Sequence, residues 1–296
     1  MGSFTFKKWN TILGWFVFSI ALVTYWSTVE PTASFWDAGE YITTASNLEV
    51  GHPPGAPLYQ LMGAFFSIFA MEATNIALTI NLMSVFASAF TILFMFWSVT
   101  ILLSNLVKKN DTLNKNNQIA ILGSAVVASL TFAFTDSFWY SAVEAEVYAM
   151  AAFIMSVLFY AGLRWEGEMF TPRGDKWVVL IAFVIGLSFG VHFMGLLTIP
   201  AIGFLYFFKN YNKVTVKNFL IANVVTVAIL LFIFKLLLPM TLRFFSAAEI
   251  FFVNQINMPF NSGTIIAGLL FLAVFYFGLR YTRSKSFVKL NTLLLC

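Results

Sequence analysis

The chain has 296 residues, of which 60% are hydrophobic and only 10% are charged. Because soluble domains carry about 25% charged residues, this composition excludes an ordinary soluble globular domain and indicates an integral membrane protein. The formal net charge is +4 at neutral pH, but the basic residues form short runs between apolar stretches, so we expect no nucleic acid partner. The only cysteine is Cys296, which excludes an internal disulfide and a metal site built from thiolates.

The first apolar segment, residues 9–27, follows Lys7 and Lys8. This arrangement resembles a signal peptide, but no small-residue cleavage site follows it. The segment is also long enough to cross a bilayer. We therefore interpret it as a retained membrane helix.

Further apolar segments recur along the whole chain. A helix that crosses a bilayer needs roughly 20 mostly apolar residues. We therefore expect an all-α fold, a polytopic bundle of transmembrane helices over residues 1–296. The expected spans are residues 9–27, 78–106, 118–135, 145–163, 177–191, 193–208, 217–238 and 263–281. The pair 177–191 and 193–208 is short and can also form one bent element. Residues 290–295 resemble the beginning of another span, so we expect the chain to be the N-terminal part of a longer protein.

The distribution of charge predicts an orientation. If the N-terminus is cytoplasmic and the spans alternate, almost all basic residues lie on the cytoplasmic side, among them Lys109, Arg173, Lys213 and Arg283. This is the positive-inside pattern of membrane proteins. Most acidic residues fall at the opposite, outer face. For a bacterial protein this places the acidic face in the periplasm, at the inner membrane.

The first outer loop, residues 28–76, is long and patterned. Ser34 followed three residues later by an acid resembles a capping box, so we expect Ser34 to cap a helix that continues through residues 41–47. The sequence His52-Pro53-Pro54-Gly55 ends that helix, because a residue before proline is pushed to an extended conformation. Pro57 suits the first turn of a second helix, expected over residues 58–71. Its length of about 15 residues favours an interfacial or re-entrant helix.

Acidic residues in this loop are candidates for catalysis. Asp37 and Glu40 are three residues apart and share one face of a helix, and His52 lies in the same loop. Two carboxylates on one face provide a base and a second group that orients a substrate or binds a cation. The alternative interpretation is a solvated acidic loop with an N-capping aspartate. The spacing shows no convincing metal-ligand set, so we expect no metal and no cofactor.

A second set of polar residues falls at the outer end of the third and fourth spans. Asp136, Tyr140, Glu144 and Tyr148 recur every four residues and would line one stripe of a continuous helix, whereas Glu146 would point elsewhere. Alternatively, they form a polar helix end with interfacial aromatic residues.

Three more residues on the outer side are candidates for substrate binding. His192 lies at an outer turn, where a packed or hydrogen-bonded role is the alternative. Lys235 and Arg243 are the basic residues that the orientation leaves on the outer side. They are candidate ligands for a phosphate, or they extend to the lipid headgroups. The acidic sets, both histidines and both cations are therefore expected at one membrane face.

Two sequence stretches resemble a known family. Residues 35–41, FWDAGEY, and residues 51–59, GHPPGAPLY, are similar to the DUF2723 family, and residues 144–149, EAEVYA, also look like its signature. A first span, an acidic outer loop, a Pro-Pro turn and an interfacial helix together resemble the GT-C glycosyltransferases. The DUF2723 family includes bacterial proteins and the transmembrane protein 260 class of protein O-mannosyltransferases.

The resemblance implies an inverting transfer of a sugar, expected to be mannose, from a polyprenyl-phosphate lipid to Ser or Thr hydroxyls of exported proteins. It implies that Asp37 or Glu40 is the base, and a phosphate-binding role for Lys235 or Arg243 would fit the same reaction. His52, Glu144, Glu146 and His192 are then expected to contact substrate. The expected partners are the sugar lipid, the exported acceptor protein and membrane lipid.

Two other functions remain open from the sequence. A polytopic protein of this kind can be a transporter or lipid flippase, although charged residues of carriers usually lie near the bilayer midplane. It can also be a non-catalytic scaffold of a larger enzyme. Sugar transfer that depends on a lipid donor distinguishes the enzyme from both.

Overall fold

The computed structural model describes residues 5–107, 113–172, 174–211 and 213–296. The chain forms two compact units. The first contains Met1–Glu168 and Phe183–Thr198, and the second contains Met169–Ala182 and Ile199–Cys296. In the described ranges the structure is helical, which confirms the predicted fold class.

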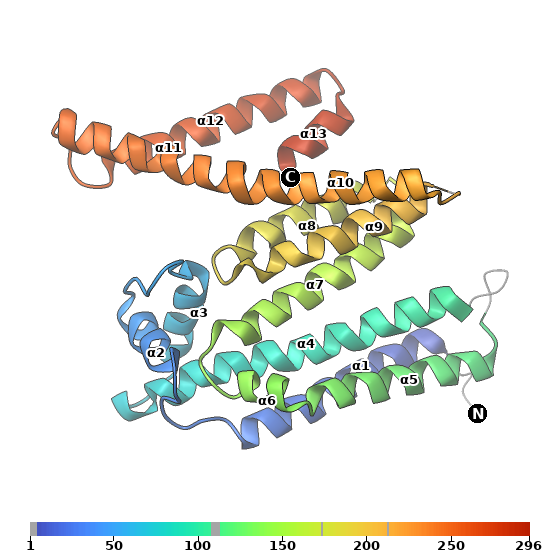
Figure 1. Ribbon diagram of the computed structural model, residues 1–296. Helices are drawn as coiled ribbons and strands as arrows, with labels where there is room; N and C mark the ends of the chain where they lie inside the picture. The colour runs from blue at the N-terminus through green and yellow to red at the C-terminus, as the bar shows by residue number, and fades with distance from the viewer. Residues whose placement is uncertain (1–4, 108–112, 173, 212) are drawn as a thin grey trace. The chain divides into compact units, whose positions relative to one another are not determined.

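The first unit is a bundle of four long helices (Figure 1): α1 (Phe6–Ser27), α4 (Ile76–Val107), α5 (Lys115–Ala133) and α7 (Val147–Glu168). Helix α4 packs against the other three. Its Ile92 and Phe96 are fully buried, in one core with Val17 of α1 and Ala125 of α5. These apolar side chains recur at helical spacing, so burying them holds the bundle together.

Hydrogen bonds join the helix ends at one end of this bundle, where α2 (Ala38–Asn47), α3 (Pro57–Ser67) and α6 (Asp136–Ala142) also lie (Figure 1). The Tyr25 hydroxyl donates to the carbonyl oxygen of Ala133 at 2.8 Å. The Asn81 side chain donates to the carbonyl oxygen of Glu30 at 2.6 Å, and the Glu30 N–H donates to the Val143 carbonyl at 3.0 Å. We call this the polar end of the bundle.

Helix α3 is anchored at its first turn by a distant glycine. The Gly190 carbonyl accepts the N–H groups of Leu58, at 2.7 Å, and Tyr59, at 3.1 Å. These are N–H groups that a helix leaves unpaired at its beginning. A Cβ at Gly190 would lie 2.7 Å from the Leu58 Cβ, so the contact requires glycine. Pro57 is in the first turn as predicted, but α3 ends at Ser67 rather than at residue 71.

The predicted cap of α2 was wrong, and one of the two interpretations of residues 136–148 is excluded. Asp37, not Ser34, is the residue that precedes α2, because the Ser34 hydroxyl donates instead to a carboxylate oxygen of Glu144. Of the two interpretations of residues 136–148, the stripe of a continuous helix is excluded, since α6 ends at Ala142 and α7 begins at Val147. Residues 143–146 form a bend between them, which we call the acidic bend.

The second unit is built mainly from the C-terminal helices. It contains the beginning of α8 (Gly174–Ser188) and most of α9 (Thr198–Asn210). A continuous helical stretch follows, which comprises α10 (Val216–Phe232), the π-helical η3 (Ile233–Leu237), α11 (Leu238–Ile250) and the π-helical η4 (Phe251–Gln255). It is followed by α12 (Ser262–Ser284) and α13 (Val288–Leu295), and α11 packs against α12. The Glu249 carboxylate accepts the N–H groups of Asn261, at 2.7 Å, and Thr264, at 2.8 Å. This fixes the turn before α12.

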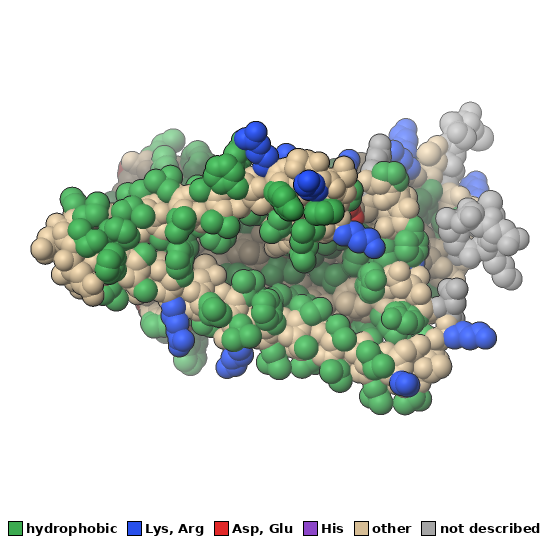
Figure 2. All heavy atoms as spheres, turned by 90° about the horizontal axis from the view of Figure 1, so that it is seen from above, with side chains coloured by type: hydrophobic (Ala, Val, Ile, Leu, Met, Phe, Trp, Pro, Cys, Tyr) green, Lys and Arg blue, Asp and Glu red, His purple; other side chains and the backbone are tan. Residues whose placement is uncertain are grey.

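Hydrophobic side chains are exposed over much of the helical surface. In Figure 2, apolar side chains predominate on the face drawn, and basic side chains are scattered over it. Seven helical stretches of the described chain are long and apolar enough to cross a membrane. Each predicted span overlaps a helix, but α8 has only 15 residues, so the count of eight spans stays a prediction. The protein is a multi-pass integral membrane protein.

Lysine residues of the first unit lie at the end opposite the polar end. Lys7 and Lys8 lie at the beginning of α1 and Lys115 at the beginning of α5, away from the polar end. Lys109 and Arg173, which we predicted on the cytoplasmic side, lie outside the described residues. Which end faces the cytoplasm stays a prediction.

Candidate functional site

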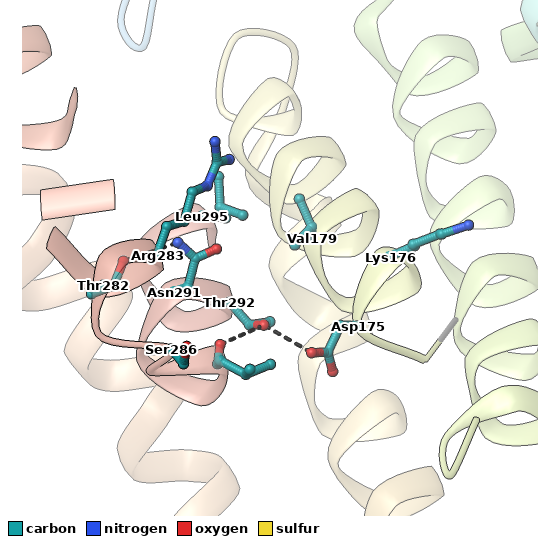
Figure 3. A pocket seen from close by; sticks show the side chains of 10 residues that line it. Asp175, Lys176, Val179, Thr282, Arg283, Ser286, Asn291, Thr292 and Leu295 are labelled. Carbon is teal, nitrogen blue, oxygen red and sulfur yellow. Dashed lines mark hydrogen bonds between the residues drawn. The ribbon is translucent and has the colours of Figure 1, made fainter. Parts of the chain in front are cut away.

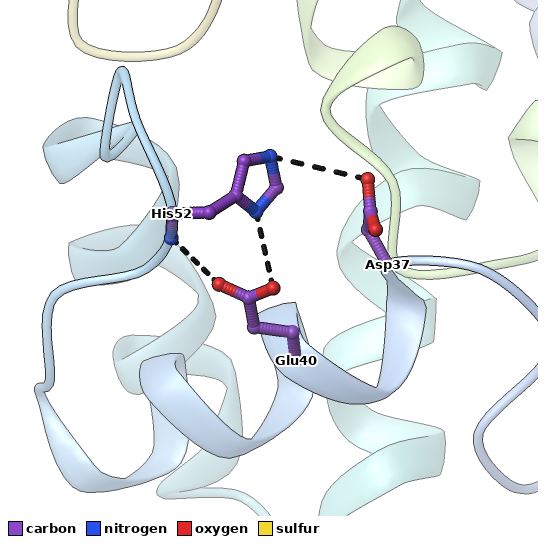
Figure 4. A group of neighbouring side chains, drawn as sticks. All are labelled: Asp37, Glu40 and His52. Atoms are coloured by element: carbon purple, nitrogen blue, oxygen red, sulfur yellow. Dashed lines mark hydrogen bonds and ion pairs between the residues drawn. The ribbon is translucent and has the colours of Figure 1, made fainter.

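Asp37, Glu40 and His52 meet at the polar end (Figure 4). Asp37 precedes α2 and Glu40 lies in its first turn, whereas His52 follows on the segment that returns toward α3. The Glu40 carboxylate accepts the backbone N–H of His52 at 2.6 Å, and its other oxygen lies 3.1 Å from His52 Nδ1. His52 Nε2 is 3.9 Å from an Asp37 oxygen.

This geometry gives the two carboxylates different roles. Both oxygens of Glu40 are occupied by His52. These hydrogen bonds, first that of the backbone N–H and then that of the side chain, hold the pKa of Glu40 below its ordinary value. An ionised carboxylate only accepts hydrogen bonds, so Nδ1 carries a proton and Nε2 is directed toward Asp37 (Figure 4). Glu40 therefore orients His52 and is poorly suited to be a base.

Asp37 is the accessible carboxylate of the cluster. Its side chain is 57% exposed, compared with 39% for Glu40. One of its oxygens lies 3.9 Å from Nε2 of His52. The residue before it, Trp36, adopts a left-handed φ of 62° and is 88% exposed. Asp37 can thus accept a proton from a group that approaches the polar end from outside.

The acidic bend brings two more carboxyl groups to this end. Glu144 and Glu146 are buried, with 6% and 8% of their surface exposed. The Ser34 hydroxyl donates to Glu144 at 2.6 Å, and Ala145 packs in a cluster with Ile42 of α2. The acids that sequence analysis assigned to two separate sets therefore lie at the same end of the bundle.

Burial changes the proton affinity of both acids in the bend. Desolvation raises the pKa of Glu144, although the Ser34 hydroxyl opposes this change. The pKa of Glu146 is raised to about 7, first by desolvation and then by the negative charges of Glu144 and Asp37. Tyr41 of α2 is affected by the same group, since desolvation and then the charge of Glu146 raise its pKa to about 12.

His192 is hydrogen-bonded and packed against an aromatic ring. Its Nδ1 accepts the backbone N–H of Met194 at 3.2 Å, which caps η2 (Phe193–Leu197). Its ring centroid is 5.6 Å from that of Tyr148, and burial lowers its pKa. A packed, hydrogen-bonded histidine accounts for these contacts, and a contact with substrate stays a prediction.

Lys235 and Arg243 belong to the second unit. Lys235 lies in the π-helical η3, with its Nζ 5.4 Å from the ring centroid of Phe234. Arg243 lies on α11, and both residues are exposed. Binding of a donor phosphate by either residue stays a prediction.

The cluster of Asp37, Glu40 and His52 has the donor types of a divalent cation site. Each residue offers one ligand atom, and these atoms lie within 4.8 Å of one another. Carboxylate and imidazole ligands suit several divalent metals. The sequence placed these three residues in one loop but did not indicate a metal-ligand set, because no metal-ligand spacing connects His52 to the two acids. Only the return of the chain after α2 brings them together.

The second unit contains a separate cavity of about 680 Å³ between α8, α12 and α13 (Figure 3). Asp175, Lys176 and Arg283 are among its lining residues. The Thr292 hydroxyl donates to Asp175 at 2.9 Å, and Figure 3 shows the Lys176 side chain directed away from that pair. No pattern in the sequence indicates this cavity.

The long apolar helices and the buried acids at one bundle end define a multi-pass membrane protein with a polar site at the end of its first unit. Residues 37–215 match the family model of the protein O-mannosyl-transferase TMEM260 N-terminal domain. The match covers more than half of the chain and includes all the acids of the site. The chain belongs to this family, which confirms the resemblance found from its motifs.

Two relatives carry the corresponding name. A protein O-mannosyl-transferase of Dictyostelium discoideum is 23% identical over 209 residues, covering 67% of this chain and 23% of the relative. A protein O-mannosyl-transferase of Mus musculus is 26% identical over 172 residues, covering 58% of this chain and 22% of the relative. The matched region thus spans less than a quarter of each relative's length. No solved structure matches the chain.

Proposed function

We propose that the chain contains the site of a membrane glycosyltransferase of the GT-C type, which transfers mannose from a polyprenyl-phosphate lipid to Ser or Thr hydroxyls of exported proteins. The observation that carries the proposal is the arrangement of Asp37, His52 and Glu40 at the polar end of the bundle (Figure 4). Membership of the TMEM260 N-terminal family supports the same assignment.

The proposed reaction requires little covalent chemistry from the protein. A lipid phosphate is already a good leaving group, and its tail keeps the donor at the membrane. The protein must hold donor and acceptor in line and remove the proton from the acceptor hydroxyl. In one displacement the acceptor oxygen forms a bond to the anomeric carbon, the bond from that carbon to the phosphate oxygen breaks, and the configuration inverts.

Asp37 is the proposed base. It is the accessible carboxylate of the cluster, whereas both oxygens of Glu40 are engaged by His52. The acceptor proton passes to an Asp37 oxygen as the new glycosidic bond forms. His52, held by Glu40, places its Nε2 beside that oxygen and fixes the electrostatic environment of the base.

The proposed orientation places the polar end on the non-cytoplasmic side, which is the periplasm if the protein resides in a bacterial inner membrane. The segregation of basic residues toward the opposite end of the first unit supports this orientation. Exported acceptor proteins would then meet the site after translocation.

The test is mannosyl transfer by the full-length protein, from a polyprenyl-phosphate mannose donor to a Ser/Thr acceptor peptide. Asp37→Asn keeps the shape and removes the charge, so turnover should fall about 10²–10⁴-fold, as for loss of a general base. The matched control, Glu49→Gln, removes an exposed acid just beyond α2 and should retain turnover. Near-native turnover in Asp37→Asn would exclude it as the base. Donor transport without a covalent product would favour a carrier.

A further inference from the structure

The acidic bend holds its last residue, Glu146, in a fixed position. The carbonyl of Val143 accepts the N–H of Glu30 at 3.0 Å. The Glu144 side chain is bonded to Ser34 at 2.6 Å, and Ala145 is fully buried against α2. Three consecutive residues before Glu146 are therefore tied to the first loop. A group placed in this way has little freedom to move into water when its charge changes.

The groups around Glu146 come from the first loop, including α2 and α3, and from the acidic bend. Its carboxyl interacts electrostatically with Asp37 before α2, with His52 on the returning segment and with Glu144 in the bend. Glu146 also acts on Tyr41 of α2 and on the fully buried Tyr59 of α3. Two of these neighbours are acids and two are phenols. The backbone N–H of Val147 and, to a smaller extent, the charge of His52 favour the ionised form, but desolvation and the two acids outweigh them. Because Glu146 is only 8% exposed, water does little to stabilise its ionised form.

We propose that Glu146 is a third carboxyl group of the site and that it works in its protonated form, donating a hydrogen bond to an oxygen atom of the sugar-phosphate donor. This inference rests on the proposed function, because it assigns Glu146 to the same substrate. It separates the two acids by role: Asp37 accepts a proton from the acceptor, and Glu146 keeps its proton. Environments that separate two carboxyl groups in this way are typical of acid and base pairs in enzymes.

The chemistry of the donor explains why a neutral acid is suitable. The phosphodiester of a lipid-linked sugar is an anion, and the site already contains the ionised carboxylate of Glu40 beside Asp37. A third ionised carboxylate would repel the donor, whereas an O–H group can donate to a phosphate oxygen or to a sugar hydroxyl oxygen. The raised pKa of Glu146, about 7, is consistent with this state.

Glutamine is the decisive substitution, because its amide donates hydrogen bonds and cannot ionise. We expect kcat/KM of Glu146→Gln at pH 6.5 to stay within about threefold of the wild type. Above pH 7 the wild type should lose about tenfold per pH unit, as a required proton is lost, while Glu146→Gln stays level. Glu146→Ala, which has no donor, should lose about tenfold or more at every pH. Glu49→Gln should keep the wild-type pH profile.

Thermal unfolding gives a readout that does not depend on activity. A carboxyl group with a raised pKa binds its proton more tightly in the folded state than in the unfolded state. Its contribution to stability is therefore present at low pH and is lost as pH rises toward 7 and beyond. The melting temperature of the wild type should fall between pH 5 and 8 relative to that of Glu146→Gln.

Results that contradict this inference differ from those that contradict the proposed function. Loss of about 100-fold or more in a folded Glu146→Gln protein, or an unchanged alkaline decline in that variant, would overturn the inference. No transfer by the wild type would instead overturn the proposed function and, with it, the donor contact. The unfolding comparison would then still decide whether Glu146 holds a proton.

Discussion

Ser34 and Glu144 are joined by a hydrogen bond of 2.6 Å between the serine hydroxyl and a carboxylate oxygen. The bond connects the loop that carries Asp37 to the bend that carries Glu146. It also explains why Ser34 does not cap α2, since its hydroxyl is directed to the bend. The relative position of the site's carboxyl groups thus depends on this contact.

Ser34→Ala should therefore lower stability and disturb the site. The substitution leaves a buried carboxylate without a hydrogen bond, which costs about 1.5–3 kcal/mol for a charged group. The free energy of unfolding should fall by about that amount. The control is Ser46→Ala, which removes a local bond to Thr43 on the surface of α2 and should cost less than about 0.5 kcal/mol. Equal stability of the two variants would show that the Ser34 bond is not important.

Glu40 and His52 should act as a unit. If the role of Glu40 is to orient His52, Glu40→Gln should cause no further loss of activity in a protein that already lacks His52. Transfer rates of Glu40→Gln, His52→Gln and the double variant should give a coupling energy of about 0.5–3 kcal/mol. Additive losses, with Glu40→Gln as damaging as Asp37→Asn, would mean that Glu40 acts on the substrate directly.

Chelation tests whether the cluster requires a metal. Three candidate ligand atoms lie within 4.8 Å, but both oxygens of Glu40 and the Nδ1 of His52 are already engaged with each other. We therefore expect mannosyl transfer to persist in excess EDTA. Loss of transfer that Mn²⁺ or Mg²⁺ restores would contradict this, and failure of that rescue in His52→Gln would identify the cluster as the metal site.

Arg243 tests the predicted phosphate contact. If its guanidinium binds the donor phosphate, Arg243→Gln should raise the KM for the lipid donor about tenfold, equivalent to roughly 1.5 kcal/mol for a hydrogen bond to a charged group. The KM for the acceptor peptide should not change. Arg280→Gln, on α12, is the matched control. An unchanged donor KM would leave Arg243 as a residue that contacts lipid headgroups.

The fold class and much of the first loop could be predicted from the sequence. Continuous apolar segments predict transmembrane helices directly. Pro57 predicted the first turn of α3, because proline suits that position. The positive-inside pattern predicted that the acids of the first loop and of residues 136–146 collect at one end, and within the first unit they do, whereas Glu166 and Glu168 lie at the other end of α7. These features depend on local composition, which a single sequence contains.

The details of the site could not be predicted in this way. The break between Ala142 and Val147 has no glycine or proline to signal it. The bend is instead held by the distant partners of Val143 and Glu144, which override helix propensity. Likewise, the contact of His52 with Glu40 depends on how the chain returns after α2. Long-range contacts decided the geometry of both, and spacing along the sequence does not report them.

The Gly190 carbonyl that anchors α3 has a consequence for biosynthesis. Leu58 and Tyr59 emerge from the ribosome long before residue 190, which arrives only after α4, α5, α6, α7 and α8 have been made. Until then the first turn of α3 lacks its partner, and the segment that presents His52 is not fixed at its far end. Assembly of the site therefore has to wait until α8 and the turn after it have been made. A nascent chain that stops before Gly190 would contain every acid of the cluster and still be without its final geometry.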